Sequence, residues 1–196
     1  FAWKVLGALL SQTGRADEAL HVNQKAVALC SHDAEALNNL GGTLKELDRF
    51  QEAEGIYKKA ISIKPDFFQA HSNLGAILQQ LGRLDEAETS LRQAISLKPD
   101  YAEAQNNLGV ILKELGKLAE AEATYKQAIS TKPDFAEAHN NMGIVLKEMD
   151  RLDEADSSLR QAIACKSDYP EAYNNLGLTL KELGRLGEAE IMIIKA

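Results

Sequence analysis

Asparagines recur in pairs along this chain, at places where their side chains could do hydrogen-bonding chemistry. The stretch ALNNLG at residues 36–41 returns as AHSNLG, AQNNLG, AHNNMG and AYNNLG. A side-chain amide has two N–H donors and one carbonyl acceptor and carries no charge, so it can pair with both the N–H and the C=O of a peptide backbone. Because asparagine is a mediocre helix former, its regular return needs a structural or functional reason.

Residues that could support catalysis or metal binding form no recognisable pattern. His71 and His139 occupy equivalent places that we expect to lie too far apart to share a metal ion. No glycine-rich phosphate loop, nucleophile elbow or zinc motif occurs in the sequence. Cys30 and Cys165 are far apart, and we expect them near helix ends as partly buried thiols. We therefore expect no enzyme activity, no cofactor and no metal.

The composition limits the classes of partner. The chain has 196 residues and a net charge of −7. A nucleic-acid-binding protein needs a positive surface, so we expect no nucleic-acid partner. No apolar run is long enough to span a membrane, and the first residues, FAWKVLGALL, do not resemble a signal peptide. We expect a cytoplasmic protein in a reducing compartment, with no membrane partner.

The asparagine pairs belong to a repeat that runs through the whole chain. Its glycine occurs at residues 7, 41, 75, 109, 143 and 177, and an alanine returns with the same interval of 34 residues. A fixed period of this length indicates a repeat protein. We number the repeat so that this glycine is position 8. The predicted units of the single array are residues 1–33, 34–67, 68–101, 102–135, 136–169 and 170–196, the last one incomplete.

Each unit is predicted to form two helices. The first follows the Lys-Pro-Asp boundary, where aspartates such as Asp100 and Asp134 precede a glutamate by three residues, the spacing of a capping box. It should end at position 15, which holds glycine or, at Asp48 and Asp150, an aspartate that also tolerates left-handed backbone. The second helix opens with acidic residues and closes with lysine, which suits the helix dipole. These patterns predict an all-α solenoid of stacked helix-turn-helix units.

The repeat resembles the tetratricopeptide repeat (TPR). The resemblance rests on Leu and Gly at positions 7 and 8, Ala at positions 20 and 27, frequent Tyr at position 24 and Pro at position 32, with Trp3 at position 4. Because of their twin asparagines, the repeats of this chain are most similar to those of O-linked N-acetylglucosamine transferases, SPINDLY-like proteins and bacterial multi-TPR proteins. This resemblance implies a right-handed superhelix whose first helices line a concave groove, where asparagines of the transferases hold the backbone of extended peptides.

A helical wheel of the first helix places position 6 on the face away from the core. The same wheel puts position 5 on that face. We define the rung asparagines as the position-6 residues, Asn39, Asn73, Asn107, Asn141 and Asn175. The leading asparagines are the position-5 residues, Asn38, Asn106, Asn140 and Asn174, with Ser72 in the third unit. Both sets are candidates for binding a peptide backbone; alternatively, they are solvated or bond to each other between repeats.

Position 9 lies on the same face but is apolar, and reads Val110, Ile144 and Leu178 in the last three units. It either packs between neighbouring first helices or forms a stripe that takes ligand side chains. We expect a module that binds an extended peptide or protein segment, and alternatively a non-catalytic substrate-recognition region of a larger enzyme such as a glycosyltransferase. The apolar run Ile191 to Ile194 predicts that further repeats, another domain or a second copy covers this helix, which allows end-to-end self-association.

Overall fold

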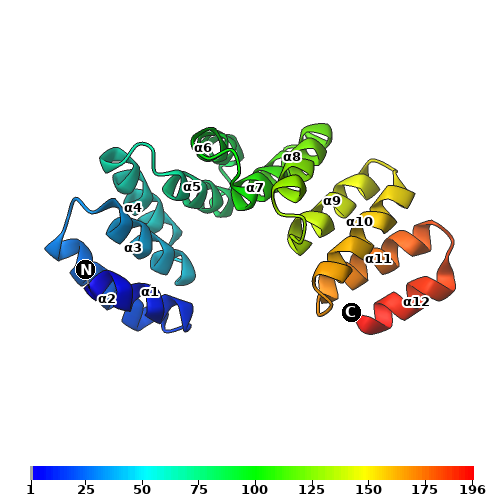
Figure 1. Cartoon of the computed structure of the whole chain (residues 1–196), viewed down its shortest axis with the longest axis horizontal. Helices are drawn as coiled ribbons and strands as arrows, with labels where there is room; N and C mark the ends of the chain where they lie inside the picture. Colours follow the sequence, from blue (N-terminus) through cyan, green and yellow to red (C-terminus); the bar gives the residue numbers. More distant parts are fainter. Residues whose placement is uncertain (1) are drawn as a thin grey trace. The chain divides into compact units, whose positions relative to one another are not determined.

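The computed structural model describes residues 2–196, and this range contains twelve α-helices and no strands (Figure 1). The helices are α1 (Ala2–Gln12), α2 (Ala16–Leu29), α3 (Ala34–Glu46), α4 (Phe50–Ile63), α5 (Phe68–Gln80), α6 (Leu84–Leu97), α7 (Ala102–Glu114), α8 (Leu118–Thr131), α9 (Ala136–Glu148), α10 (Leu152–Cys165), α11 (Pro170–Glu182) and α12 (Leu186–Lys195). The predicted all-α class, with one helix pair in every 34-residue unit, is confirmed.

The chain forms two compact units, residues 1–99 and residues 100–196. The first unit holds the pairs α1–α2, α3–α4 and α5–α6, and the second holds α7–α8, α9–α10 and α11–α12. Within a unit, each helix packs against the next one along the chain, and the first helices of neighbouring pairs also contact each other. Each helix therefore touches only its own and adjacent repeats, as expected for nearest-neighbour stacking.

The turns inside the helix pairs use left-handed backbone at position 15, as predicted. Asp48 has φ of 56° and Asp150 has φ of 60°. The four glycines at this position, Gly14, Gly82, Gly116 and Gly184, have φ between 72° and 75°. Only residues that tolerate positive φ can end these helices without strain.

The predicted aspartate caps at the start of the first helices are wrong. The N-cap residue is one place further on and is aromatic in most repeats, for example Tyr101 before α7 and Phe135 before α9, without a side-chain cap. Asp33 alone among these positions caps its helix, accepting hydrogen bonds from the backbone N–H groups of Glu35 and Ala36. The aromatic residues are used for packing instead. The ammonium group of Lys132, for instance, lies 4.8 Å from the centre of the Phe135 ring.

The interior of each pair is built on the position-8 glycine. A Cβ atom added to Gly109 would lie 2.5 Å from Cε1 of Tyr125, and one added to Gly143 would lie 2.6 Å from Cγ of Leu159. Tyr125 and Leu159 are fully buried. The glycine lets the large residue at position 24 of the second helix reach the backbone of the first, which closes the pair.

Candidate functional site

The twin asparagines form hydrogen bonds from one repeat to the next. Nδ2 of Asn141 donates to Oδ1 of Asn106 at 3.1 Å, and Nδ2 of Asn175 donates to Oδ1 of Asn140 at 3.0 Å. In the first unit, Nδ2 of Asn73 donates to Oδ1 of Asn38 at 2.9 Å. In each of these bonds a rung asparagine donates to the leading asparagine of the preceding repeat. The alternative that the asparagines bond to each other is correct for these three pairs.

Two of the leading asparagines are not on the open face expected from the helical wheel. Asn106 and Asn140 are only 8% and 5% exposed. The wheel treats a helix as isolated, whereas α9 packs against α7, and α11 against α9, on the side that holds these residues. Asn174 on α11 is exposed and Asn38 is half-buried. Buried amides need partners, and the rung asparagines supply them.

The rung asparagines keep hydrogen-bonding capacity for a ligand. Asn73, Asn107, Asn141 and Asn175 are half-buried, and within residues 2–196 the side-chain amides of Asn141 and Asn175 make no hydrogen bond besides these inter-repeat bonds. In Asn73, Asn141 and Asn175, one amide hydrogen is used in the inter-repeat bond, which leaves one N–H donor and the carbonyl oxygen. A peptide unit offers one acceptor and one donor, so each oriented amide can match one peptide unit.

Asn39 differs from the other rung asparagines. The leading position of the preceding repeat is Lys4, and its ammonium group pairs with Asp33 and Glu35 at 2.9 Å each. Within residues 2–196 the Asn39 side chain makes no hydrogen bond, although it is half-buried. Its whole amide is therefore available to a ligand.

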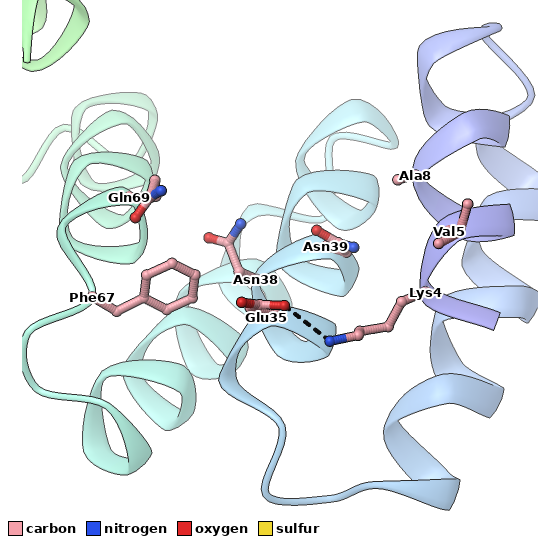
Figure 2. A pocket seen from close by; sticks show the side chains of 8 residues that line it. All are labelled: Lys4, Val5, Ala8, Glu35, Asn38, Asn39, Phe67 and Gln69. Atoms are coloured by element: carbon pink, nitrogen blue, oxygen red, sulfur yellow. Dashed lines mark hydrogen bonds and ion pairs between the residues drawn. The ribbon is translucent and has the colours of Figure 1, made fainter. Parts of the chain in front are cut away.

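Two hollows on the first unit meet at this residue. We call the larger one, about 370 Å³, the first hollow; it lies between α1, α3 and the start of α5 (Figure 2). The second hollow, about 220 Å³, continues along α1 and α3 past Gly42 and Thr43. Ala8, Asn38 and Asn39 line both. The position-5 and position-6 asparagines of this unit thus line concave surface, as a ligand site requires.

The apolar stripe at position 9 is partly exposed. Val110 and Ile144 are half-buried, and Leu178 is 38% exposed. These side chains present apolar surface on the first helices α7, α9 and α11. The equivalent residues of the first unit, Ala8, Gly42 and Ala76, are small.

Ion pairs between charged side chains link neighbouring repeats at their second helices rather than beside the asparagines. Arg151 pairs with Glu122 of α8 and Glu154 of α10, both at 2.6 Å. Arg83 makes the same bridge between Glu54 of α4 and Glu86 of α6. Hydrogen bonds from Arg151 and Lys126 hold the pKa of Glu122 below its ordinary value. These ion pairs are structural links between second helices.

A buried polar cluster in the first unit escaped the sequence analysis. Nδ2 of Asn23 donates to the hydroxyl oxygen of Thr43 at 3.0 Å, and the hydroxyl groups of Ser11 and Thr43 lie 3.0 Å apart. Ser11 and Thr43 line the second hollow. The signal was present in two substitutions, an asparagine where other repeats hold Tyr, Leu or Ile and a threonine where they mostly hold Ile or Val.

The remaining candidate groups make local contacts. The Nε2–H groups of His71 and His139 donate to the carbonyl oxygens of Pro65 and Pro133. Cys30 is exposed rather than partly buried, and so is Cys165, because both lie where a second helix ends. Within residues 2–196, no three His, Cys, Asp or Glu side chains are arranged to hold a metal ion. No described helix is long and apolar enough to cross a membrane.

Comparison with known families identifies the repeat. Models of the tetratricopeptide repeat match residues 2–66, 66–134 and 124–156, and a TPR repeat model matches residues 145–184. The chain therefore belongs to the tetratricopeptide repeat family. No curated protein sequence matches the chain.

Solved structures share the fold. YrrB, described as a TPR protein with an unusual peptide-binding site, is 25% identical with a TM-score of 0.69, covering 92% of this chain and 90% of that one. TTC0263, a thermophilic TPR protein of Thermus thermophilus, is 25% identical with a TM-score of 0.77, covering 92% and 98%. PilW, a type IV pilus biogenesis factor, is 20% identical with a TM-score of 0.90, covering 97% and 89%. These matches do not support the particular similarity to O-linked N-acetylglucosamine transferases and SPINDLY proteins.

Proposed function

We propose that this chain is a non-catalytic binding module, and that the rung asparagines hold the backbone of an extended peptide or protein segment. The observation that carries the proposal is the inter-repeat bond that joins three of the rung asparagines to leading asparagines. This bond fixes the orientation of the rung amide before a ligand arrives. A pre-oriented amide loses less conformational freedom on binding than a free one.

Two further observations support this function. The described surface of the first unit is hollowed where Asn38 and Asn39 lie, and the apolar residues at position 9 provide neighbouring contact surface for ligand side chains. YrrB, a structural relative, has a peptide-binding site. Backbone recognition predicts that the part of the affinity contributed by the rung amides depends weakly on peptide sequence, since every peptide unit offers the same donor and acceptor.

The structure provides a matched test of the ladder. Asn106→Ala and Asn141→Ala both remove the same 3.1 Å bond, but only Asn141→Ala also removes amide groups that face the ligand. The probe is a set of peptides selected from a random-sequence displayed library on the unmodified chain, then synthesised with blocked ends. Calorimetry should show about fivefold weaker binding for Asn141→Ala and less than twofold for Asn106→Ala.

The comparison of the two variants can contradict the proposal. Equal losses of affinity would mean that the bond acts only through the stability of the repeat stack. Undiminished affinity in Asn141→Ala, and in the double variant with Asn175→Ala, would show that the rung amides do not contact the ligand. Melting curves of Asn106→Ala and Asn141→Ala measure the shared loss of stability.

Three finer expectations remain proposals. Exposed Ile191, Ile193 and Ile194 on α12 favour self-association through this helix. The exposed free thiols of Cys30 and Cys165 favour a reducing compartment such as the cytoplasm. A role as the substrate-recognition region of a larger enzyme would be decided by the complete reading frame.

A further inference from the structure

The two hollows of the first unit adjoin each other at three shared lining residues, one of which is Asn39. Ala8 on α1 and Asn38 and Asn39 on α3 line both of them. Figure 2 shows Asn39 pointing from α3 toward the side of α1 that carries Ala8 and Val5, and the Phe67 ring pointing toward Asn38. The space exists because position 9 is small here: Gly42 has no side chain, and Ala8 has only a methyl group.

The chemistry of this space favours a neutral occupant that is mostly apolar. The first hollow contains one lysine and one glutamate, Lys4 and Glu35, and these pair with each other at 2.9 Å. The second also contains one of each, Lys45 and Glu46. Neither hollow has a net charge. In the first hollow, a charged ligand group would lose its hydration without gaining an unpaired counter-charge.

The walls combine apolar surface with a free amide. Val5, Ala8 and the Phe67 ring supply carbon surface, and Asn39 supplies donors and an acceptor without a partner among residues 2–196. Tyrosine and tryptophan have this same combination, a large apolar ring with one polar edge. Their rings bury a large area with little loss of rotamer freedom, and they often dominate interface energies.

We infer that the space around Asn39, Ala8 and Gly42 is a specificity subsite that takes a tyrosine or tryptophan side chain of the bound segment. The Asn39 carbonyl accepts the phenol or indole hydrogen, and the ring lies between Val5 and Phe67. The inference rests on the proposed function, because it assigns one side chain of the same ligand. It also assigns the two units different roles. In the second unit Val110, Ile144 and Leu178 occupy the equivalent positions, so side-chain selection occurs in the first unit.

The test fills the subsite by one substitution. A Cβ atom on Gly42 would approach only the Tyr57 hydroxyl, at 3.9 Å, so the helix backbone there has room for the Cβ atom of Gly42→Val, whose methyl groups add bulk to the subsite. The control is Gly55→Val on α4, where a Cβ atom meets nothing within 4 Å and which lines a separate hollow between α2 and α4. Ala8→Leu fills the subsite from α1 as a second variant.

A random-sequence peptide library displayed on phage is selected on each protein. The unmodified chain and Gly55→Val should enrich tyrosine or tryptophan at one peptide position, and Gly42→Val and Ala8→Leu should not. Replacing that residue by alanine in a selected synthetic peptide should weaken binding about tenfold on the unmodified chain, and about twofold or less on Gly42→Val. Asn39→Ala should abolish the preference for tyrosine over phenylalanine while the preference for phenylalanine over alanine remains.

Two outcomes would overturn the inference. One is equal aromatic enrichment on Gly42→Val and on the unmodified chain. The other is selection of peptides that depend on Asn141 but show no aromatic preference, which leaves the backbone ladder standing. Failure to select any peptide would overturn the ladder and the subsite together.

Discussion

The hydroxyl group of Tyr125 provides a sharp test of the packing argument. The ring fills the space left by Gly109 and is fully buried, but its hydroxyl oxygen is buried and has no hydrogen-bond partner among residues 2–196. Burial raises the pKa of Tyr125, with Glu114 and Glu148 adding to the effect. The substitution Tyr125→Phe keeps the ring and removes the unsatisfied group.

The expected change follows from two opposing terms. An unsatisfied buried hydroxyl destabilises a fold by about 1–3 kcal/mol. Removing the oxygen leaves a void of roughly 10 Å³, which costs about 0.2 kcal/mol. The net expectation is a gain of about 1 kcal/mol, or a rise in Tm of about 2–4 °C for a chain of this length.

Thermal melting followed by circular dichroism measures the effect. Tyr57→Phe is the matched comparison, because Tyr57 packs on Gly41 in the same way but lines the second hollow, and its change in Tm should be smaller. Amide hydrogen exchange should show the added protection of Tyr125→Phe in α7 and α8. A Tm that falls by a few degrees in Tyr125→Phe would refute the reasoning, since it would mean that the hydroxyl has a stabilising partner.

Three further predictions concern packing, charge and association. Gly143→Ala places a methyl group 2.6 Å from Leu159 and should destabilise the chain by about 1–3 kcal/mol, whereas Gly55→Ala, with open space around it, should stabilise by about 0.5–1 kcal/mol; chemical denaturation compares the two. The folded-state pKa of Glu122 lies below its ordinary 4.5, so the ionised carboxylate stabilises the fold above pH 4.5, and this stabilisation is lost as the pH falls through the folded-state pKa. The loss of stability on acid titration should be smaller in Arg151→Gln. If α12 mediates self-association, sedimentation should show a concentration-dependent mass for the unmodified chain, and Ile194→Asp, at a position that is 77% exposed, should abolish that dependence.

The sequence predicted the repeat frame well because the frame depends on local rules. Position 15 needs positive φ, so Gly116 and Asp150 identify the ends of α7 and α9 without tertiary information. The helical wheel that turns position 6 outward puts Leu108, Ile111 and Leu112 of α7 on the opposite, core face, and these three residues are buried.

Other features depend on contacts between repeats, which a single-helix argument cannot contain. Asn106 was placed on the open face, but the next first helix covers it. Asp100 has the spacing of a cap, but the aromatic Tyr101 takes the N-cap position, as Phe135 does beside its lysine neighbour. The hollows around Asn39 could not be located from sequence because their shape depends on small side chains from two helices, Ala8 and Gly42.

The offset of the inter-repeat amide bond has a consequence for the evolution of the array. Each bond joins residue i of one repeat to residue i+35 in the next, as in Asn106 and Asn141 or Asn140 and Asn175. The donor and the acceptor of successive bonds are encoded side by side in one dipeptide. Within a run of such repeats, in-frame duplication or loss of a 34-residue segment recreates the same bond at the new junction. The Asn-Asn dipeptide thus makes the stack tolerant of unequal recombination, so the length of the binding face can change by whole repeats without a compensating substitution.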